Sequence, residues 1–284
     1  MLLAFIASMA LLLSSGAEPG KTLSMAGVSA TADVHPPSPV ARYDAQAEQE
    51  LLTLTNHERE RVGVHPLQID PNLTAAARAH AVAMARQHQL SHQLAGEAPL
   101  QQRLATTALH LDHAGENVAL DVDVEQAHDG LMHSPHHREN LLQADYNVVG
   151  FGIARVGDEI YVVEDFGHSL PAYAAADAEN AVAAAITRAR WQVRQPELRR
   201  IQLSNLRSAA CRMATEDRLD PKEVKAFGPL RSVLTYTNSE PDNLPGSAEQ
   251  VLRDRNLRSY AVGTCYAQTP SYPNGAYFVT LALY

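Results

Sequence analysis

The stretch SHQLAGEAPLQQRLATTALHLDHAGENVALDVDVEQAHDGLMHSPHHREN, residues 91–140, carries three short polar motifs in succession. They are SH at residues 91–92, GENVA at residues 115–119 and SPHHREN at residues 134–140. Each motif alone is a weak signal, but a histidine, a glutamate and a second histidine in this order are able to share one site. We expect His92, Glu116 and His137 to meet in a polar cleft on a single folded unit.

The length of the chain, 284 residues, exceeds what one small core usually organises. It predicts two folded units of about 100–150 residues each. Lysine and arginine number 23 against 32 aspartate and glutamate residues, which gives a net charge of −9. Binding to phosphate backbones needs a basic face, so this balance excludes nucleic acid as a partner.

The N-terminal residues 1–17 have the pattern of a signal peptide. An apolar run from Leu2 to Leu13 is followed by the small residues of Ser15–Ala17, and the run is too short to span a bilayer. We therefore expect a secreted or periplasmic protein whose mature chain has no transmembrane span. A non-secretory interpretation stays open because no lysine or arginine precedes the run. Residues 18–43, rich in Gly, Ser, Ala, Thr and Pro, predict a disordered linker.

Helix signals follow the linker. A first helix is expected from near Tyr43 to a stop at Gly63, and a second from Asp70, the N-cap, with Pro71 at the first helical position, to about residue 89. The second helix would deliver His92 just beyond its C-terminal end.

A shorter helix is expected over residues 124–132, and Ser134–Pro135 predicts another helix start. His137 then takes the third helical position, where the partial positive charge of the helix end disfavours imidazolium and keeps the ring neutral. Two strands, residues 146–156 and 159–166, are expected to form a hairpin through Gly157–Asp158.

Beyond Leu170 the composition changes, and residues 171–284 predict a smaller C-terminal α+β unit. The expected helices are residues 178–191, 204–218 and 247–256, and the expected strands are residues 232–237, 259–267 and 276–283. No nucleophile, metal or phosphate motif stands out in this part.

The only two cysteines of the chain, Cys211 and Cys265, lie in this second unit. An oxidising compartment would preserve them as one disulfide, and two buried free thiols are the alternative. A disulfide would join a helix to a strand and contribute on the order of 4 kcal/mol in the chain-entropy model.

Several ordered motifs together carry a resemblance to a known family. They are LTNHER at residues 54–59, HPL at 65–67, AARAHA at 76–81, SH at 91–92, GENVA at 115–119, SPHHR at 134–138 and DFG at 165–167. Residues 44–168 thus resemble a CAP-superfamily domain, the group of cysteine-rich secretory proteins, antigen 5 and pathogenesis-related proteins, in its bacterial SCP-like form. We expect the bounds of this domain at residues 44–170. The resemblance implies an α+β fold, a CAP-type α-β-α sandwich.

The resemblance also implies a cleft with two histidines and one or two acidic residues that bind zinc or another divalent cation in some members. Matched by motif, His92 and His137 are the histidines and Glu116 the acidic residue, and these three form the expected metal ligand set. The family's second glutamate would fall near residues 132–134, where this chain has His133. We expect the cleft to be lined by His92, Glu116, Asn117, His133 and His137.

Three further histidines, His110, His113 and His128, raise the local density of imidazole. None of them has ligand spacing to another motif, and we expect all three on the surface.

Three functions fit these observations. The first is an exported, non-catalytic binding module for a small molecule, a lipid or a divalent metal, and it is favoured because no zinc-protease signature such as HExxH or recognisable nucleophile motif is present. The second is a metal-assisted hydrolase in which His92 and His137 hold the ion and Glu116 activates water. The third is an envelope or cell-surface interaction protein with a vestigial cleft. The sequence assigns no catalytic residue and no oligomeric state.

Overall fold

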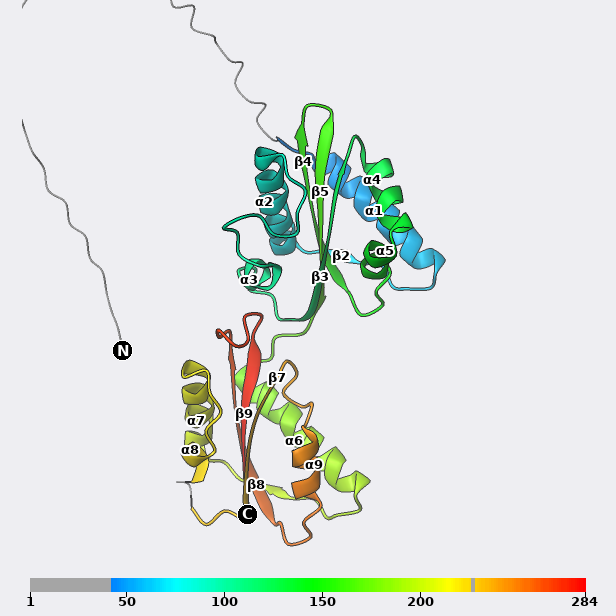
Figure 1. Cartoon of the computed structure of the whole chain (residues 1–284). Helices are drawn as coiled ribbons and strands as arrows, with labels where there is room; N and C mark the ends of the chain where they lie inside the picture. The colour runs from blue at the N-terminus through cyan, green and yellow to red at the C-terminus, as the bar shows by residue number, and fades with distance from the viewer. Residues whose placement is uncertain (1–41, 226–227) are drawn as a thin grey trace, which may run out of the picture. The chain divides into compact units, whose positions relative to one another are not determined.

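The computed structural model describes residues 42–225 and 228–284 (Figure 1). The expected signal peptide and almost all of the expected linker lie outside the described residues. The last two residues assigned to the linker form a short strand, β1 (Arg42–Tyr43), which pairs with β4. Among the described residues, none of the helices combines the length and apolar character that crossing a membrane requires.

The first half of the described chain, residues 42–169, builds one sheet. Its further strands are β2 (Gln68–Ile69), β3 (Leu111–Asp121), β4 (Val148–Val156) and β5 (Glu159–Ser169). Their order is β1-β4-β5-β3, with β2 pairing in parallel with β4 and all other pairs antiparallel. The predicted β4–β5 hairpin is present and turns at Gly157, whose φ is +61°. β3, which was not anticipated as a strand, lies at the end of this order.

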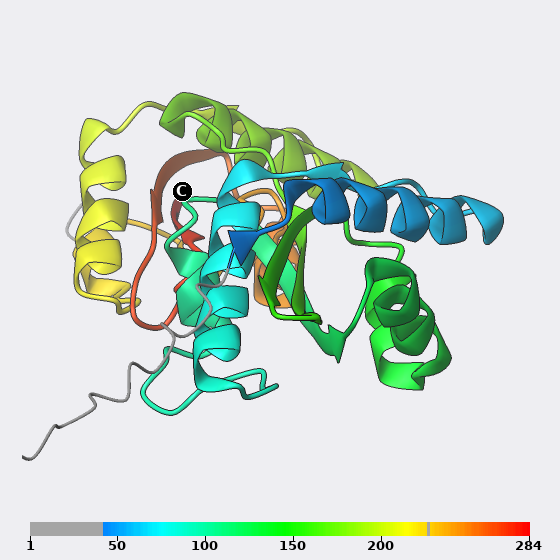
Figure 2. The ribbon, with the colours of Figure 1, turned by 90° about the horizontal axis from the view of Figure 1, so that it is seen from above.

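Helices cover both faces of this sheet (Figure 1). They are α1 (Ala45–Arg61), α2 (Pro71–Gln87), α3 (Leu100–Ala105), α4 (Val124–His133) and α5 (Pro135–Leu141). α1, α4 and α5 pack on one face, with Leu51, Val124 and Phe166 in the same core cluster. α2 packs on the other face against Val118 and Val163. Figure 2 shows the sheet between α2 and the pair α4 and α5.

α2 begins as the sequence predicted. Asp70 is the N-cap and accepts from the backbone N–H groups of Asn72 and Leu73, with Pro71 in the first turn. The helix lies so close to β4 that a Cβ on Gly152 would overlap the backbone of Ala77. This approach requires glycine on the strand and fixes α2 over the sheet.

The second half, residues 175–284, builds a separate sheet with the same connectivity. Its strands are β6 (Arg199–Arg200), β7 (Ser232–Asn238), β8 (Ser259–Ala267) and β9 (Ala276–Leu283), in the order β6-β8-β9-β7. Its helices are α6 (Ala175–Gln192), α7 (Ser204–Thr215), α8 (Lys222–Lys225) and α9 (Gly246–Leu252). A short parallel strand, two long antiparallel pairs and helices on both faces therefore occur in both halves.

The polar framework also recurs. In the first half Glu48 of α1 pairs with Arg78 of α2, and the Nε–Oε1 distance is 2.8 Å. In the second half Glu179 of α6 pairs with Arg207 of α7 at the same distance. Each of these ion pairs ties the first long helix of its half to the helix on the opposite face.

A buried arginine near the end of the first long helix recurs as well. Arg59 donates to the backbone carbonyls of four residues, and Arg190 donates to those of three. The acceptors are His65, Leu141, Gln143 and Tyr146 for Arg59, and Pro196, Leu252 and Asp254 for Arg190. In both halves the guanidinium bonds carbonyls of loops and of the last residue of a short helix, and so ties them to the long helix.

The fold class is α+β, as predicted, with a sandwich of helices on both faces of a sheet followed by a smaller α+β arrangement. The expected disulfide between Cys211 on α7 and Cys265 on β8 is confirmed, with a Cα–Cα distance of 5.0 Å. It joins a helix to a strand and closes a separation of 54 residues.

Candidate functional site

Glu116 is the centre of the candidate site. It lies on β3, and its side chain is only 2% exposed. Oε1 is 2.9 Å from Nδ1 of His92, and Oε2 accepts from Nη2 of Arg103 at 2.6 Å. Both carboxylate oxygens are therefore engaged by protein groups.

The loop after α2 positions His92. Arg103 of α3 donates to the backbone carbonyl of His92 at 3.1 Å as well as to Glu116. The His92 side chain is 59% exposed, and the nitrogen that faces Glu116 is Nδ1. This orientation leaves Nε2 on the opposite side of the ring for an external ligand.

His80, on α2, is a buried packing residue that supports the same loop. Its Nδ1 lies 2.8 Å from Oε1 of Glu97, and its Nε2 lies 2.9 Å from the carbonyl of Ser91. The same Nε2 is 3.8 Å from Oε2 of Glu116. His80 and Glu97 thus hold the residue next to His92 in place.

Asn117 organises the other face of β3, because side chains alternate along a strand. It donates to the backbone carbonyl of His137 at 3.1 Å and to Oε2 of Glu164 at 2.8 Å. Its own oxygen accepts from Asn140, which also donates to the carbonyl of Glu116. These amides fix α5, and with it His137, against the strand that carries Glu116.

His137 is half-buried on α5. Burial lowers the pKa of its imidazole, and the charges of His92 and His136 lower it further. The ring is therefore neutral near pH 7 and keeps a nitrogen lone pair available.

Two buried carboxyl groups lie behind the site on β5. Burial raises the pKa of Glu164 to about 8, although a hydrogen bond from Asn117 opposes the shift. Burial and then the negative charge of Glu116 raise the pKa of Asp165 well above its ordinary value. At neutral pH Glu164 is protonated. Asp165 lies opposite Glu116 across the strand pair, and its protonated form would be able to donate to the Glu116 carboxylate.

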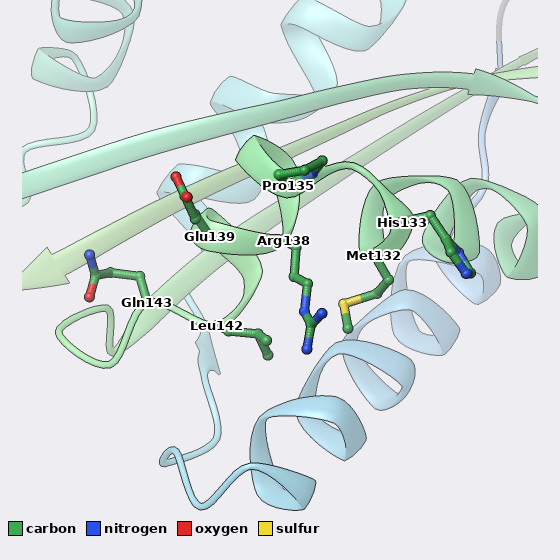
Figure 3. Close-up of a pocket in the computed structure, with 7 residues that line it drawn as sticks. All are labelled: Met132, His133, Pro135, Arg138, Glu139, Leu142 and Gln143. Carbon is green, nitrogen blue, oxygen red and sulfur yellow. The ribbon is translucent and has the colours of Figure 1, made fainter.

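A pocket of about 650 Å³ opens beside α4 and α5. It is lined by Met132, His133, Pro135, Arg138, Glu139, Leu142 and Gln143. In Figure 3 the side chains of Met132, Arg138 and Leu142 extend into the same space. A neighbouring pocket of about 420 Å³ shares Met132, His133 and Arg138 and continues towards α1.

The structure brings together only part of the predicted set. His92 and Glu116 are in direct contact, and Asn117 joins Glu116 on β3 to His137 on α5. His133 instead borders the pocket beside α4, where its Nδ1 is 3.3 Å from Oδ1 of Asp129. The metal-ligand role of His92, His137 and Glu116 stays a prediction.

The expectation for the three additional histidines was wrong for two of them. His113 is exposed, but His110 and His128 are buried. His128 is buried because the helical period of α4 places it with Val124, Ala127 and Leu131 on the inward face.

Sequence reasoning missed Arg103 and the raised pKa of Asp165. Arg103 lies on a six-residue helix without a side-chain cap, so no local pattern marked it. Asp165 was visible in the DFG motif, but its unusual state depends on burial, which the motif does not reveal.

Comparison with known proteins places this site in a family context. Residues 52–166 match the CAP family, described as the cysteine-rich secretory protein family. The uncharacterized protein YkwD of Bacillus subtilis is 31% identical over 122 residues, which is 43% of this chain and 46% of YkwD. The uncharacterized membrane protein YlbC of the same organism is 33% identical over 115 residues, which is 40% of this chain and 33% of YlbC. The chain thus matches less than half of the length of either relative.

A solved structure is similar to part of the chain. It is an extracellular protein containing an SCP domain from Bacillus anthracis, 28% identical, with a TM-score of 0.41. The match covers 44% of this chain and 41% of that protein.

Proposed function

From the premise that residues 52–166 form a CAP domain, we propose that this domain is a non-catalytic binding module of an exported protein. Its cleft crosses the strand β3 and includes His92, Glu116, Asn117 and His137. The observation that carries the proposal is the engagement of both Glu116 oxygens, by His92 at 2.9 Å and by Arg103 at 2.6 Å.

This engagement argues against the hydrolase alternative. A general base must accept a proton from water in the reacting complex. Proton uptake by Glu116 would break a charge-assisted bond to a largely buried guanidinium, since the Arg103 side chain is only 10% exposed. The neighbouring Glu164, whose pKa is raised to about 8, is protonated at neutral pH, and both Glu164 and Asp165 are fully buried, so neither is better placed as a base.

The same contacts suit a divalent metal held by imidazoles. A carboxylate on one ring nitrogen of a histidine orients the ring so that the other nitrogen faces the ion. Glu116 has this relation to His92, and His137 supplies a second neutral nitrogen. His92 and His137 would hold the ion, and Glu116 would act through His92. A zinc ion there would supply a Lewis-acidic attachment point for an oxygen ligand.

A lipid or other amphiphile is the second candidate ligand, and the pocket beside α4 favours it. A volume of about 650 Å³ lies in the range of small-ligand sites. Met132 and Leu142 offer apolar surface, and Arg138 offers a positive charge for an anionic head group.

Zinc binding and turnover together test the proposal. The full chain, stripped with a chelator, is dialysed against zinc and also assayed on ester and peptide substrates. We expect zinc retention without turnover, and less zinc in the double variant His92→Ala/His137→Ala. Turnover that disappears in His137→Ala would establish the hydrolase instead. Unchanged zinc content in the double variant would remove the metal role of these histidines.

Export has its own support. The predicted signal peptide and the disulfide between Cys211 and Cys265 both favour an oxidising compartment. Detection of the mature chain outside the cytoplasm, starting after about residue 17, is the expected result.

A further inference from the structure

A second cluster of metal-ligating groups lies at the far end of the β3–β5 pair, where no predicted site residue is found. It consists of Asp112, His113 and His168. Nδ1 of His113 is 3.0 Å from Oδ1 of Asp112, and Nδ1 of His168 is 2.7 Å from the same oxygen. One ligand atom from each residue lies within 4.8 Å of the other two. Within residues 42–225 and 228–284, this is the one group of three or more His, Cys, Asp or Glu residues whose ligand atoms lie this close together.

A β-bulge creates the cluster. The pairing of β3 with β5 is regular from His113 onward but shifts between Leu111 and His113, so Asp112 is the extra residue. In a regular strand Asp112 and His113 would point to opposite faces of the sheet. A bulge bends the strand and changes the direction of its side chains. Here it brings Asp112 beside His113 and beside His168, the residue of β5 that pairs with His113.

The donor set determines which ion would fit. Two imidazole nitrogens and one carboxylate oxygen suit zinc and related divalent transition metals, and three protein ligands leave one position open. Ligands about 2.0–2.1 Å from a tetrahedral ion are about 3.3 Å from one another. The two Nδ1–Oδ1 distances, 3.0 and 2.7 Å, are slightly shorter, so a small outward movement of the rings would admit the ion. His113 is 62% exposed and His168 30%, which leaves a path for entry.

We propose that Asp112, His113 and His168 form a surface site for a divalent transition metal of the zinc class, separate from the cleft at Glu116. The site shares no residue with the cleft and goes beyond the function proposed above. The ion would replace the hydrogen bonds that both imidazoles now direct at one carboxylate oxygen. It would cross-link β3 to β5 at the irregular end of the pair.

The test isolates this site by removing the cleft histidines. Full-length His92→Ala/His137→Ala protein, stripped of metal, is titrated with zinc in a calorimeter. We expect one zinc ion per chain to bind. Adding His168→Ala or Asp112→Asn should weaken zinc binding at least about 10–100-fold, since loss of groups that merely orient a ligand already has this effect.

The matched control is His133→Ala in the same background. His133 is also an exposed histidine beside an aspartate, Asp129, but that pair has no third ligand atom nearby. We expect zinc affinity to stay unchanged. Circular dichroism of the metal-free variants checks that Asp112→Asn and His168→Ala remain folded.

Three results would overturn the site: no zinc bound in the cleft-deleted background, equal affinity after His168→Ala and Asp112→Asn, or an equal loss after His133→Ala. The cleft is judged separately. If the wild type and the cleft-deleted protein bind the same single ion, the metal role of the cleft fails and the surface site stands.

Discussion

The two halves of the molecule share a framework but differ at the residues of the candidate cleft. Gly152 on β4 and Gly263 on β8 occupy equivalent positions. Gly152 faces the backbone of α2 at Arg78, which pairs with Glu48. Gly263 faces the backbone of α7 at Arg207, which pairs with Glu179. Their strand partners are Val163 and Thr280. Residues at the same number of positions from these two pairs, along the strands and across the strand pairing, are taken as equivalent in the two sheets.

In this alignment, four buried polar residues of the first half have apolar counterparts. Glu116, Asn117, Glu164 and Asp165 correspond to Val233, Leu234, Leu281 and Ala282. The counterparts also face the matching side: Leu281 packs with α6, and Ala282 packs with Leu206 of α7.

The comparison separates what the fold needs from what the cleft needs. Burying carboxyl groups without full hydrogen bonding costs free energy, and the second half shows that the topology forms without them. Retention of four polar groups in the first half therefore favours a function for them. The shared ion pairs and buried arginines are the part that stabilises both halves.

The largest expected effect concerns this shared framework. Arg59→Ala and Arg190→Ala should each lower the free energy of unfolding by about 3–5 kcal/mol, because buried carbonyls lose their donors and a cavity remains. Urea denaturation followed by circular dichroism measures this. Arg61→Ala is the control, since Arg61 is exposed and bonds Glu58. A loss confined to Arg59→Ala would show that the second half does not depend on its arginine.

The next effect tests a difference between the halves. The disulfide partners Cys211 and Cys265 correspond to Val82 and Ala154, which pack in one hydrophobic cluster of the first half. Cys211→Ala/Cys265→Ala should lose about 4 kcal/mol under oxidising conditions, because the unfolded chain is no longer cross-linked. The wild type and the variant should have similar stability after reduction. A large difference that persists with a reductant would assign the effect to packing instead.

The sequence predicted the elements whose signals are local. The Asp70–Pro71 cap, the Gly157 turn and the strands Ser259–Ala267 and Ala276–Leu283 were found at the expected positions. β3 was missed because its centre, Gly115–Asn117, has residues with low strand propensity. Pairing with β5, whose partner residues lie 39–58 positions later in the chain, is what makes it a strand.

The likeness of the two halves was invisible for a related reason. Motifs such as GENVA and SPHHREN have no counterpart in residues 175–284, and the shared residues are scattered ion-pair and arginine positions. Only the strand register aligns them. In the cleft, the motif order anticipated the His92–Glu116 contact, but Arg103 and Asp165 act through burial and tertiary contact.

A smaller effect follows from the buried carboxyl group Glu164. Its pKa is raised to about 8 in the folded state from an ordinary 4.5, so between these values the folded chain holds a proton that the unfolded chain releases. The contribution of Glu164 to stability is then greatest below pH 4.5 and falls as pH rises towards 8, by at most about 1.4 kcal/mol per pH unit.

Glu164→Leu, which copies the residue at position 281, should remove this part of the slope. Asp165 contributes a slope of the same sign, which remains. Urea midpoints of unfolding between pH 5 and 9 measure the change. The control is Glu159→Gln, since Glu159 is exposed. An unaltered slope in Glu164→Leu would mean that Glu164 is ionised in the folded protein.

The smallest expected effect tests whether the charge of Arg103 opposes a cation in the cleft. Arg103 occupies one carboxylate oxygen and adds a positive charge close to any bound cation. Arg103→Gln should therefore strengthen zinc binding in the cleft about tenfold, which corresponds to about 1.4 kcal/mol. The exposed Arg86→Gln is the control for loss of one positive charge. Zinc titrations would use protein carrying His168→Ala, so that the surface cluster does not contribute. A rise no larger than in the control would show that the charge of Arg103 does not act on the bound ion, and this would contradict a zinc site next to His92 and Glu116.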